Sequence, residues 1–176
     1  MPAEHSTDAT IIQLEQEAAE LLSKSGHCAQ TTFSVLSDHF ELEGGATLRA
    51  LTPLPGIALR GEVCGAVIGG LIALGLVYGR DDLTDLAAFR RSLPPARSFC
   101  RLFQSRYDSI NCGDILEKEM GQRYDLSKRR DYLDYINCGG HETCSAVVMT
   151  SVRLVAEHLL EEQKKEPNEP GVMLTV

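Results

Sequence analysis

Cysteines are the residues of this chain whose side chains could carry chemistry. The sequence contains six of them, namely Cys28, Cys64, Cys100, Cys112, Cys138 and Cys144. No basic segment precedes an early apolar run, so we expect no signal peptide, a cytoplasmic location and reduced thiols. Reduced cysteines in such a chain favour metal binding or redox chemistry, whereas the simplest alternative is that they are small buried hydrophobic residues.

Four of these cysteines lie near the N-termini of predicted helices, on or beside the inward-facing stripe: Cys28, Cys64, Cys112 and Cys144. Asn111 and Thr143 directly precede two of them and can act as N-caps. Helix N-termini offer unpaired N–H groups and a positive partial charge, and both favour the thiolate over the thiol. Because the thiolate binds metals and attacks disulfides, these four cysteines are the candidate site residues.

The other two cysteines receive different interpretations. Cys100 shares a predicted helix with Phe103 and is interpreted as core packing. Cys138 belongs to the tetrapeptide Ile-Asn-Cys-Gly, which occurs at 110–113 and again at 136–139. That repetition makes Cys138 a rival to Cys144 as the fourth member of the site.

The long spacing of the cysteines excludes several classes of site. The sequence contains no Cys-x-x-Cys pair, which disfavours a thioredoxin-like dithiol, a zinc ribbon or finger, and covalently attached haem. Cysteines this far apart must be gathered by the fold. An iron–sulfur cluster accepts four thiolates, and so does tetrahedral zinc. A reversible disulfide between two of the four, without any metal, is a further alternative.

Three features lie beside the candidate cysteines. His27 and His141 could support or replace a ligand, although surface or capping roles are the simpler interpretation. The Pro/Gly-rich loop at 51–61 precedes Cys64 and is either a rim of the site or a plain connector.

The glycine-rich stretch at 61–79 is the element around which we expect the fold to be organised. It carries no charge from Val63 to Tyr78 and contains the glycines Gly61, Gly65, Gly69, Gly70, Gly75 and Gly79. This run is shorter than the roughly 20 residues needed to cross a bilayer, and so many glycines disfavour a strand. We therefore predict a central helix that is apolar on all sides and buried. Its glycines indicate closely approaching backbones or space for a bound centre beside Cys64.

Helical periodicity and break signals predict further helices on both sides of this stretch, at about 11–25, 28–40, 47–51, 83–92, 96–109, 112–121, 122–134 and 144–164. Ser6, Thr7 or Asp8 can cap the first, and Pro94-Pro95 is expected to separate two others. The formal net charge of −8 makes nucleic acid or an anionic membrane an unfavourable partner.

The segment Cys-Gly-Ala-Val-Ile-Gly at 64–69, followed by Ala-Leu-Gly-Leu-x-x-Gly at 73–79, resembles the redox-active protein family named for its cysteine pattern C-GCAxxG-C-C. Cys28 in Gly-His-Cys-Ala-Gln and Cys112 in Ile-Asn-Cys-Gly-Asp-Ile-Leu resemble the first and third family cysteines. Cys144 resembles the fourth better than Cys138 does, because apolar residues of a final helix follow it. The resemblance extends over about 20–160. It implies a redox role without a settled reaction.

We therefore predict one all-α domain over 1–176, with a core at about 8–164, loose termini at 1–7 and 165–176, and six to eight helices around the central one. The expected function is that of a redox or electron-transfer protein that binds an iron–sulfur cluster or other metal through Cys28, Cys64, Cys112 and Cys144. The alternatives are a thiol/disulfide redox module without metal and a structural zinc protein that acts by binding a partner. We expect an unidentified redox partner protein, no membrane span, and an uncharged glycine face that could form a homodimer.

Overall fold

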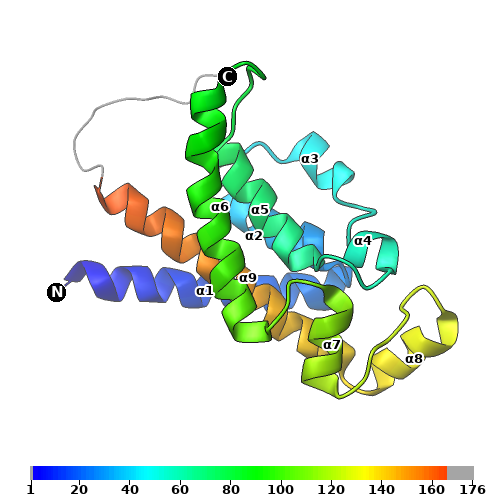
Figure 1. Ribbon diagram of the computed structural model, residues 1–176. Coiled ribbons are helices and arrows are strands. Elements are labelled where there is room, and N and C mark those ends of the chain that lie inside the picture. Colours follow the sequence, from blue (N-terminus) through cyan, green and yellow to red (C-terminus); the bar gives the residue numbers. More distant parts are fainter. Residues whose placement is uncertain (1, 166–176) are drawn as a thin grey trace.

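The computed structural model describes residues 2–165, with side chains from Thr7 onward. Within this range the chain folds into nine helices and no sheet (Figure 1). They are α1 (Pro2–Ser25), α2 (Cys28–His39), α3 (Gly45–Ala50), α4 (Gly56–Leu59), α5 (Gly65–Tyr78), α6 (Leu86–Tyr107), α7 (Cys112–Met120), α8 (Arg129–Asn137) and α9 (Gly140–Lys165). The all-α fold class is confirmed. Besides the central α5 there are eight helices in this range, the upper limit of the expected six to eight, and one of them, α4, is a single short turn within the 51–61 loop.

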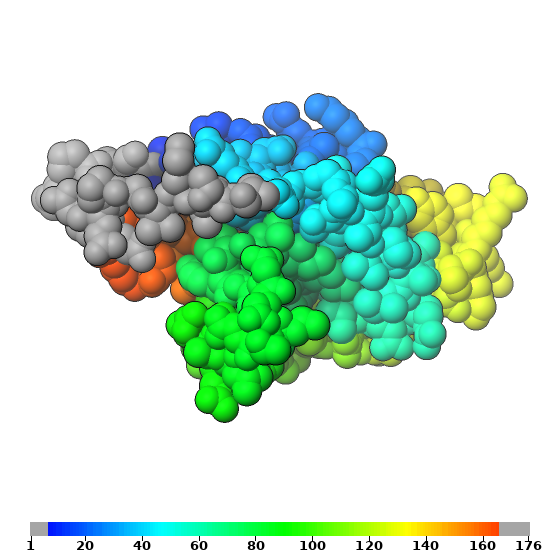
Figure 2. Space-filling model, turned by 90° about the horizontal axis from the view of Figure 1, so that it is seen from above, coloured from blue at the N-terminus to red at the C-terminus, as the bar shows by residue number. Residues whose placement is uncertain are grey.

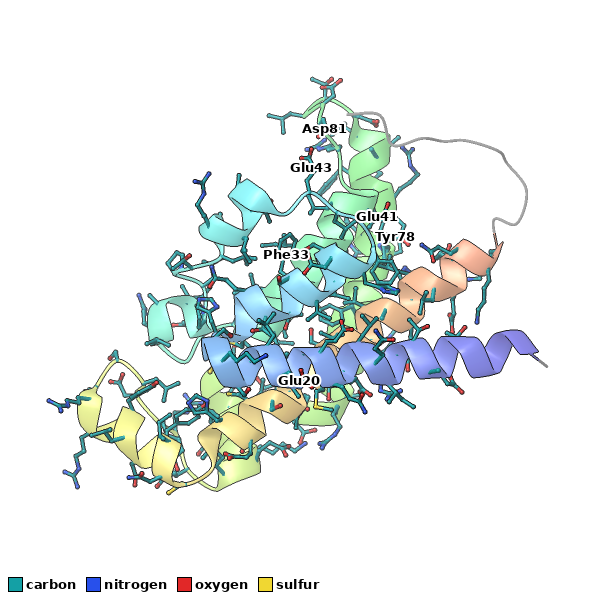
Figure 3. All side chains as sticks on the ribbon, turned by 180° about the vertical axis from the view of Figure 1, so that it is seen from behind. Glu20, Phe33, Glu41, Glu43, Tyr78 and Asp81 are labelled. Atoms are coloured by element: carbon teal, nitrogen blue, oxygen red, sulfur yellow. The ribbon has the colours of Figure 1, made fainter. Side chains whose placement is uncertain are left out.

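Helix α5 packs against α2, α6 and α9, while α1 packs along α9 and against α2. α1 and α9 run in opposite directions across the molecule, as Figure 1 shows. These helices bury a common core, in which Phe33 points inward from α2 while Glu20 on α1 points to solvent (Figure 3). The largest fully buried side chains include Leu14, Phe33, Leu36, Val67, Phe103, Tyr107, Val148 and Val152. The central element expected from the sequence is therefore present, and it begins at Gly65 instead of residue 61.

The glycines of α5 act differently along its length. A Cβ on Gly69 would lie 2.5 Å from the carbonyl oxygen of Ala29, and one on Gly70 would lie 2.8 Å from Cζ of Phe99. Close backbone approach is thus confirmed for the N-terminal part. Gly75, in contrast, has no heavy atom within 4 Å of such a Cβ, and the neighbouring Leu76 is exposed. The prediction of a helix buried on all sides is therefore wrong for its last turn.

Helix α6 runs without interruption through Pro94 and Pro95, so the predicted break is wrong. The two prolines deprive the carbonyls of Arg90 and Arg91 of their helical N–H partners. Both arginines are exposed, so water can satisfy these carbonyls. The helix is held beyond the prolines by the buried aromatic residues Phe99, Phe103 and Tyr107.

The helix ends also differ in part from the predicted ones. Helix α1 begins at Pro2, so the predicted cap at 6–8 is wrong and the segment 2–7 is helical. The charged stretch predicted as a helix at 122–134 is irregular up to Lys128, and α8 follows from Arg129 to Asn137. This segment forms one end of the molecule when seen from above (Figure 2). Helix α9 ends at Lys165, and the tail predicted to be loose lies, from 166 on, outside the described residues.

Helix α9 is the one described helix that is long and apolar enough to cross a membrane. It has 26 residues and reaches a mean hydropathy of 1.2. Its apolar stripe packs into the core through Val148, Val152, Val155 and Leu159. A core helix passes the same length and composition test, so the finding is weak evidence for a span.

Candidate four-cysteine site

Cys64 and Cys112 are held side by side by backbone hydrogen bonds between the segments before α5 and before α7. The N–H of Cys64 donates to the carbonyl of Ile110 at 2.8 Å, and the N–H of Cys112 donates to the carbonyl of Glu62 at 2.7 Å. Val63 and Asn111 form an isolated antiparallel bridge between these bonds. Cys112 is the first residue of α7, as the sequence predicted, whereas Cys64 is the N-cap of α5 and does not lie inside the helix as expected.

Cys28, the first residue of α2, reaches the same place because Gly65 has no side chain. A Cβ on Gly65 would lie 2.5 Å from Sγ of Cys28 and 3.0 Å from the backbone nitrogen of Ala29. No real Cβ fits at that distance. Gly65 therefore makes room beside Cys64 for the sulfur of Cys28. Space at a glycine for a bound centre stays a prediction.

Cys144 joins these three from α9, but not from a helix start. Helix α9 begins at Gly140, so Thr143 lies inside it and its hydroxyl donates to the carbonyl of Gly139 at 3.1 Å. The predicted cap at Thr143 is therefore wrong, because the helix begins one turn earlier. The phenol of Tyr135, on α8, lies 3.1 Å from Sγ of Cys144.

Cys100 and Cys138 stay outside the group. Cys138 is exposed at the C-terminus of α8, where its thiol lies 3.9 Å from the carboxylate of Asp134. Cys100 is partly buried against the core, and only burial raises the pKa of its thiol. The structure therefore groups Cys144 with the other three cysteines and leaves its rival Cys138 at the surface.

A cavity of about 60 Å³ opens beside this group. Three of the four sulfur-bearing residues line it, namely Cys28, Cys112 and Cys144. The remaining wall comes from three places, namely the end of α1, the surroundings of α4, and α8 with the start of α9. These residues are Leu22, Gly26, Pro55, Leu59, Leu126, Tyr132, Tyr135 and His141. Cys64 is 5% exposed and does not line this cavity. The loop at 51–61 therefore forms part of the rim of the site.

The rim around α4 has an unusual backbone. Ile57, Ala58 and Leu59 have φ values of 49°, 56° and 63°, which form a left-handed turn. Such a turn costs roughly 1–2 kcal/mol per residue that carries a side chain. Its first residue, Gly56, packs on the site, since a Cβ there would lie 3.5 Å from Sγ of Cys112.

The four thiols are buried close enough to one another to interact electrostatically. Burial, followed by the nearby Cys144, raises the pKa of Cys64 to about 12. Burial and then the other three cysteines raise the pKa of Cys28 well above its usual value, and burial likewise raises the pKa of Cys112 and of Cys144. The N–H groups of Ala66 and Val67 lower the pKa of Cys64, as expected at a helix N-terminus, but burial outweighs them. The prediction that these sites favour free thiolates is therefore wrong.

The donor set is suited to a metal, whereas its arrangement is not that of a formed metal site. Four cysteine thiolates are the ligands typical of iron–sulfur clusters and of structural zinc. Among the described residues, however, no group of three or more His, Cys, Asp or Glu side chains is arranged so that it could hold a metal ion.

The two neighbouring histidines have different surroundings. Nδ1 of His27 accepts from the N–H of Gln30 at 3.1 Å and caps α2, so its Nε2 carries the proton that faces the carbonyl of Thr52 at 2.9 Å. This is the capping role, with both ring nitrogens engaged. His141 lines the cavity, and its ring centroid lies 6.0 Å from that of Tyr135.

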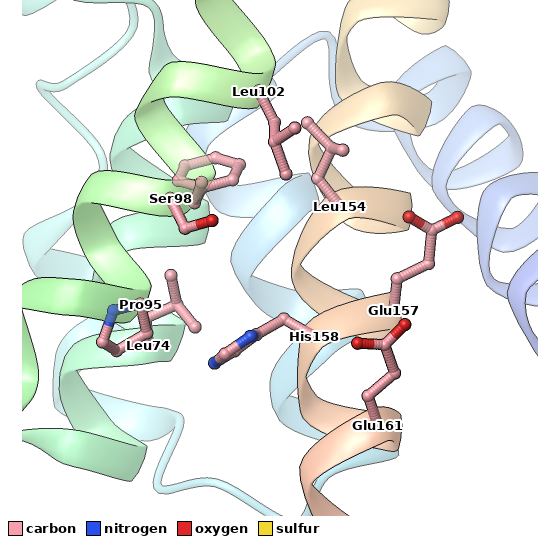
Figure 4. A pocket seen from close by; sticks show the side chains of 9 residues that line it. Leu74, Pro95, Ser98, Leu102, Leu154, Glu157, His158 and Glu161 are labelled. Atoms are coloured by element: carbon pink, nitrogen blue, oxygen red, sulfur yellow. The ribbon is translucent and has the colours of Figure 1, made fainter.

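A second cavity, of about 160 Å³, lies between α5, α6 and α9 and contains no cysteine. His158 projects into it from α9, opposite Pro95 of α6 and Leu74 of α5 (Figure 4). This second cavity shares no lining residue with the cavity beside the four cysteines.

One family model matches residues 26–158, and its description reads "Putative redox-active protein (C_GCAxxG_C_C)". The chain belongs to this family. The match covers more than half of the sequence and includes all four candidate cysteines, so the resemblance found in the motifs is confirmed. Comparisons with curated proteins and with solved structures found no match. As a member of the C_GCAxxG_C_C family, the chain is grouped with redox-active proteins.

Sequence reasoning missed Tyr135 and Gly140. Tyr135 is buried in a second apolar cluster with Leu116 and Tyr124, against which Cys112 and Cys144 pack. A signal was available, because three tyrosines, at positions 124, 132 and 135, recur in a segment that otherwise reads as charged and exposed.

Proposed function

We propose that this chain is an electron-transfer protein in which Cys28, Cys64, Cys112 and Cys144 together bind an iron–sulfur cluster or another thiolate-bound metal. One observation carries the proposal. Four cysteines that are far apart in the sequence come together from α2, α5, α7 and α9, while Cys100 and Cys138 remain outside.

The electrostatics of the group support a cationic occupant. Without one, each thiolate would be buried beside the others, and so the thiols keep their protons. A bound metal deprotonates its cysteine ligands outright and offsets their charge. An iron–sulfur cluster would supply reversible one-electron chemistry, with a potential that depends on burial and on hydrogen bonds to sulfur. The helix N-terminal N–H groups of Ala66 and Val67 would then act on a thiolate at Cys64.

Metal binding would require the sulfurs to close in, because they are not arranged as a formed site. The cavity beside them is lined on one side by the left-handed turn at α4 and on another by the segment of α8. Strained backbone of this kind is concentrated at ligand-binding and switching sites. Coupling between metal binding and local folding is general, since a ready-made set of ligands rarely exists without the metal.

A disulfide-based function is the second candidate, and the same arrangement favours it. Four free thiols lie together, and they are not arranged as a formed metal site among the described residues. Two of them would lose two protons and two electrons to an acceptor and form one S–S bond. A structural zinc site is the third candidate, because zinc takes the same four ligands.

Anaerobic purification followed by absorbance, iron, sulfide and zinc analysis tests these candidates. Visible charge-transfer bands with iron and sulfide support the cluster, and zinc without colour supports the structural site. A colourless metal-free protein whose thiols oxidise in pairs supports the disulfide. Cys→Ser variants at 28, 64, 112 and 144 should each remove a bound metal, whereas a disulfide couple should be lost in the two variants of the paired cysteines. Cys100→Ser and Cys138→Ser serve as controls and should retain the metal or the couple. If the four single variants behave like these controls, the proposed site is wrong.

A further inference from the structure

We propose that Tyr135 is a positioning residue that sets the redox potential of the four-cysteine site through a hydrogen bond to Sγ of Cys144. The inference rests on the proposed redox function and names a residue outside the family's cysteine and glycine pattern.

The contact that carries it joins α8 to α9. The hydroxyl oxygen of Tyr135 lies 2.7 Å from the carbonyl oxygen of Gly140 and 3.1 Å from Sγ of Cys144. A phenol has one proton, and here it faces two acceptors. The carbonyl of Gly140 is also the helical acceptor for the N–H of residue 144, so it keeps a partner when the phenol turns to the sulfur.

The ring of Tyr135 is held in place from several sides. A Cβ on Gly140 would lie only 2.1 Å from Cε2 of this ring, so a glycine is required for the ring to pack against the first turn of α9. Tyr132 stacks on the ring at 6.2 Å between centroids, and Tyr124 meets it edge-on at 5.8 Å. Tyr135 is 6% exposed. The hydroxyl is therefore fixed beside Cys144 by the packing of the ring against Gly140, Tyr132 and Tyr124.

The phenol of Tyr135 can donate a hydrogen bond in both redox states of the site. A tyrosine phenol is protonated at neutral pH and can donate one hydrogen bond. With the sulfur as thiol, the S–H of Cys144 can donate to the phenol oxygen while the phenol donates to the carbonyl of Gly140. With the sulfur as metal-bound thiolate, the phenol donates to the sulfur, because hydrogen bonds to charged acceptors are the stronger ones.

The hydrogen bond acts on the redox equilibrium in a defined direction. If the cysteines held a metal centre, its one-electron reduction by a mediator would increase the negative charge on the sulfurs, and the hydroxyl of Tyr135 at Cys144 would stabilise that reduced form. Tyr135 keeps its proton throughout, and no covalent bond of Tyr135 is made or broken. If the couple is a dithiol and a disulfide, the hydrogen bond from Tyr135 also favours the reduced dithiol. The reason is that Sγ of Cys144 makes this hydrogen bond only when it is not part of a disulfide. The wild-type potential is therefore higher than it would be without the hydroxyl.

The experiment compares Tyr135→Phe with the control Tyr107→Phe. Both keep a buried ring and lose a hydrogen-bonded hydroxyl, but the hydroxyl of Tyr107 contacts Thr150 and the carbonyl of Ala146, and Tyr107 does not line the cavity. Mediator-equilibrated redox titration of the protein as isolated should show a lower potential for Tyr135→Phe, equivalent to about a tenfold shift towards the oxidised form. Tyr107→Phe should titrate like the wild type. Equal potentials in wild type and Tyr135→Phe would overturn the inference while leaving the proposed function intact.

A second measurement uses the reduced, metal-free protein and needs no redox couple. The infrared S–H stretching band that disappears in Cys144→Ser should lie at lower frequency in the wild type than in Tyr135→Phe, because the thiol is hydrogen-bonded only in the former. A band at the position of a free thiol in the wild type would overturn the inference, even if Tyr135→Phe failed to fold. A protein with a bonded S–H band but without any metal or disulfide couple would overturn the proposed function and, with it, the role in tuning.

Discussion

The two ends of α5 have similar composition and opposite surroundings. At the N-terminal end, Gly65 and Gly69 meet the backbone and sulfur of α2, and Cys64 is buried. At the C-terminal end, Gly75 meets nothing, and Leu76 is 42% exposed. Both ends carry glycines four residues apart, so spacing alone does not reveal which glycine lets another helix approach. The neighbouring helix decides it, because α2 lies against Gly65 and Gly69, whereas no heavy atom lies within 4 Å of a Cβ on Gly75.

The largest expected effect comes from the buried end, in reduced protein without metal. Cys64 has a pKa of about 12 when folded, against about 9 for an ordinary thiol. Because the folded thiol holds its proton more tightly, its contribution to stability is complete below about pH 9 and is lost as the pH rises towards 12. The full loss is roughly 4 kcal/mol. Urea unfolding under anaerobic conditions across this pH range measures it.

The matched control for this loss of stability at alkaline pH is Cys64→Ala. Without the thiol, the free energy of unfolding should fall less steeply above pH 9, although it starts lower because a buried group has been removed. Parallel pH profiles for the two proteins would show that Cys64 does not ionise on unfolding in the way proposed here.

The next effect is the loss of close approach at Gly69. A methyl group there would lie 2.5 Å from the carbonyl oxygen of Ala29 and 3.1 Å from the nitrogen of Phe33, and backbone atoms cannot move aside cheaply. Overpacking of this kind costs about 1–3 kcal/mol and outweighs the gain in helix propensity. We therefore expect Gly69→Ala to lower the free energy of unfolding by about 2 kcal/mol, measured by the urea midpoint. An unchanged midpoint would mean that α2 and α5 are farther apart than the structure has them.

Gly75→Ala should have a smaller effect of the opposite sign. The site is exposed, and a methyl group there meets no atom within 4 Å. Alanine is favoured over glycine in a helix by about 1 kcal/mol, so the variant should be more stable by up to that amount. Urea unfolding beside Gly69→Ala gives the direct contrast. Destabilisation by Gly75→Ala would place a contact at this end that the described residues do not contain.

The contrast also separates what the sequence could predict from what it could not. Periodicity and glycine content indicated a central helix, and the motif around Cys64 indicated its partners Cys28, Cys112 and Cys144. Local sequence signals could not predict where α9 begins, because Thr143 is a residue type typical of N-caps. The helix begins instead at Gly140, where the Tyr135 ring packs and leaves no room for a side chain. Nor could local signals give the continuity of α6 across Pro94 and Pro95, which depends on packing of distant aromatic residues. The thiolate prediction failed for a related reason, since burial is a property of the whole fold.

The smallest effect is expected at Leu76, and it tests whether the exposed end of α5 is free. Leucine and glutamine have similar helix propensities, and a side chain that is 42% exposed loses little apolar contact on replacement. Leu76→Gln should therefore change the free energy of unfolding by less than about 0.5 kcal/mol. A second copy of the chain seated on this end would bury Leu76, and stability would then depend on protein concentration. A larger loss of unfolding free energy in Leu76→Gln, growing with protein concentration, would thus identify this end of α5 as a homodimer interface. A small loss at all concentrations means that the glycine-rich helix is covered only by its own chain.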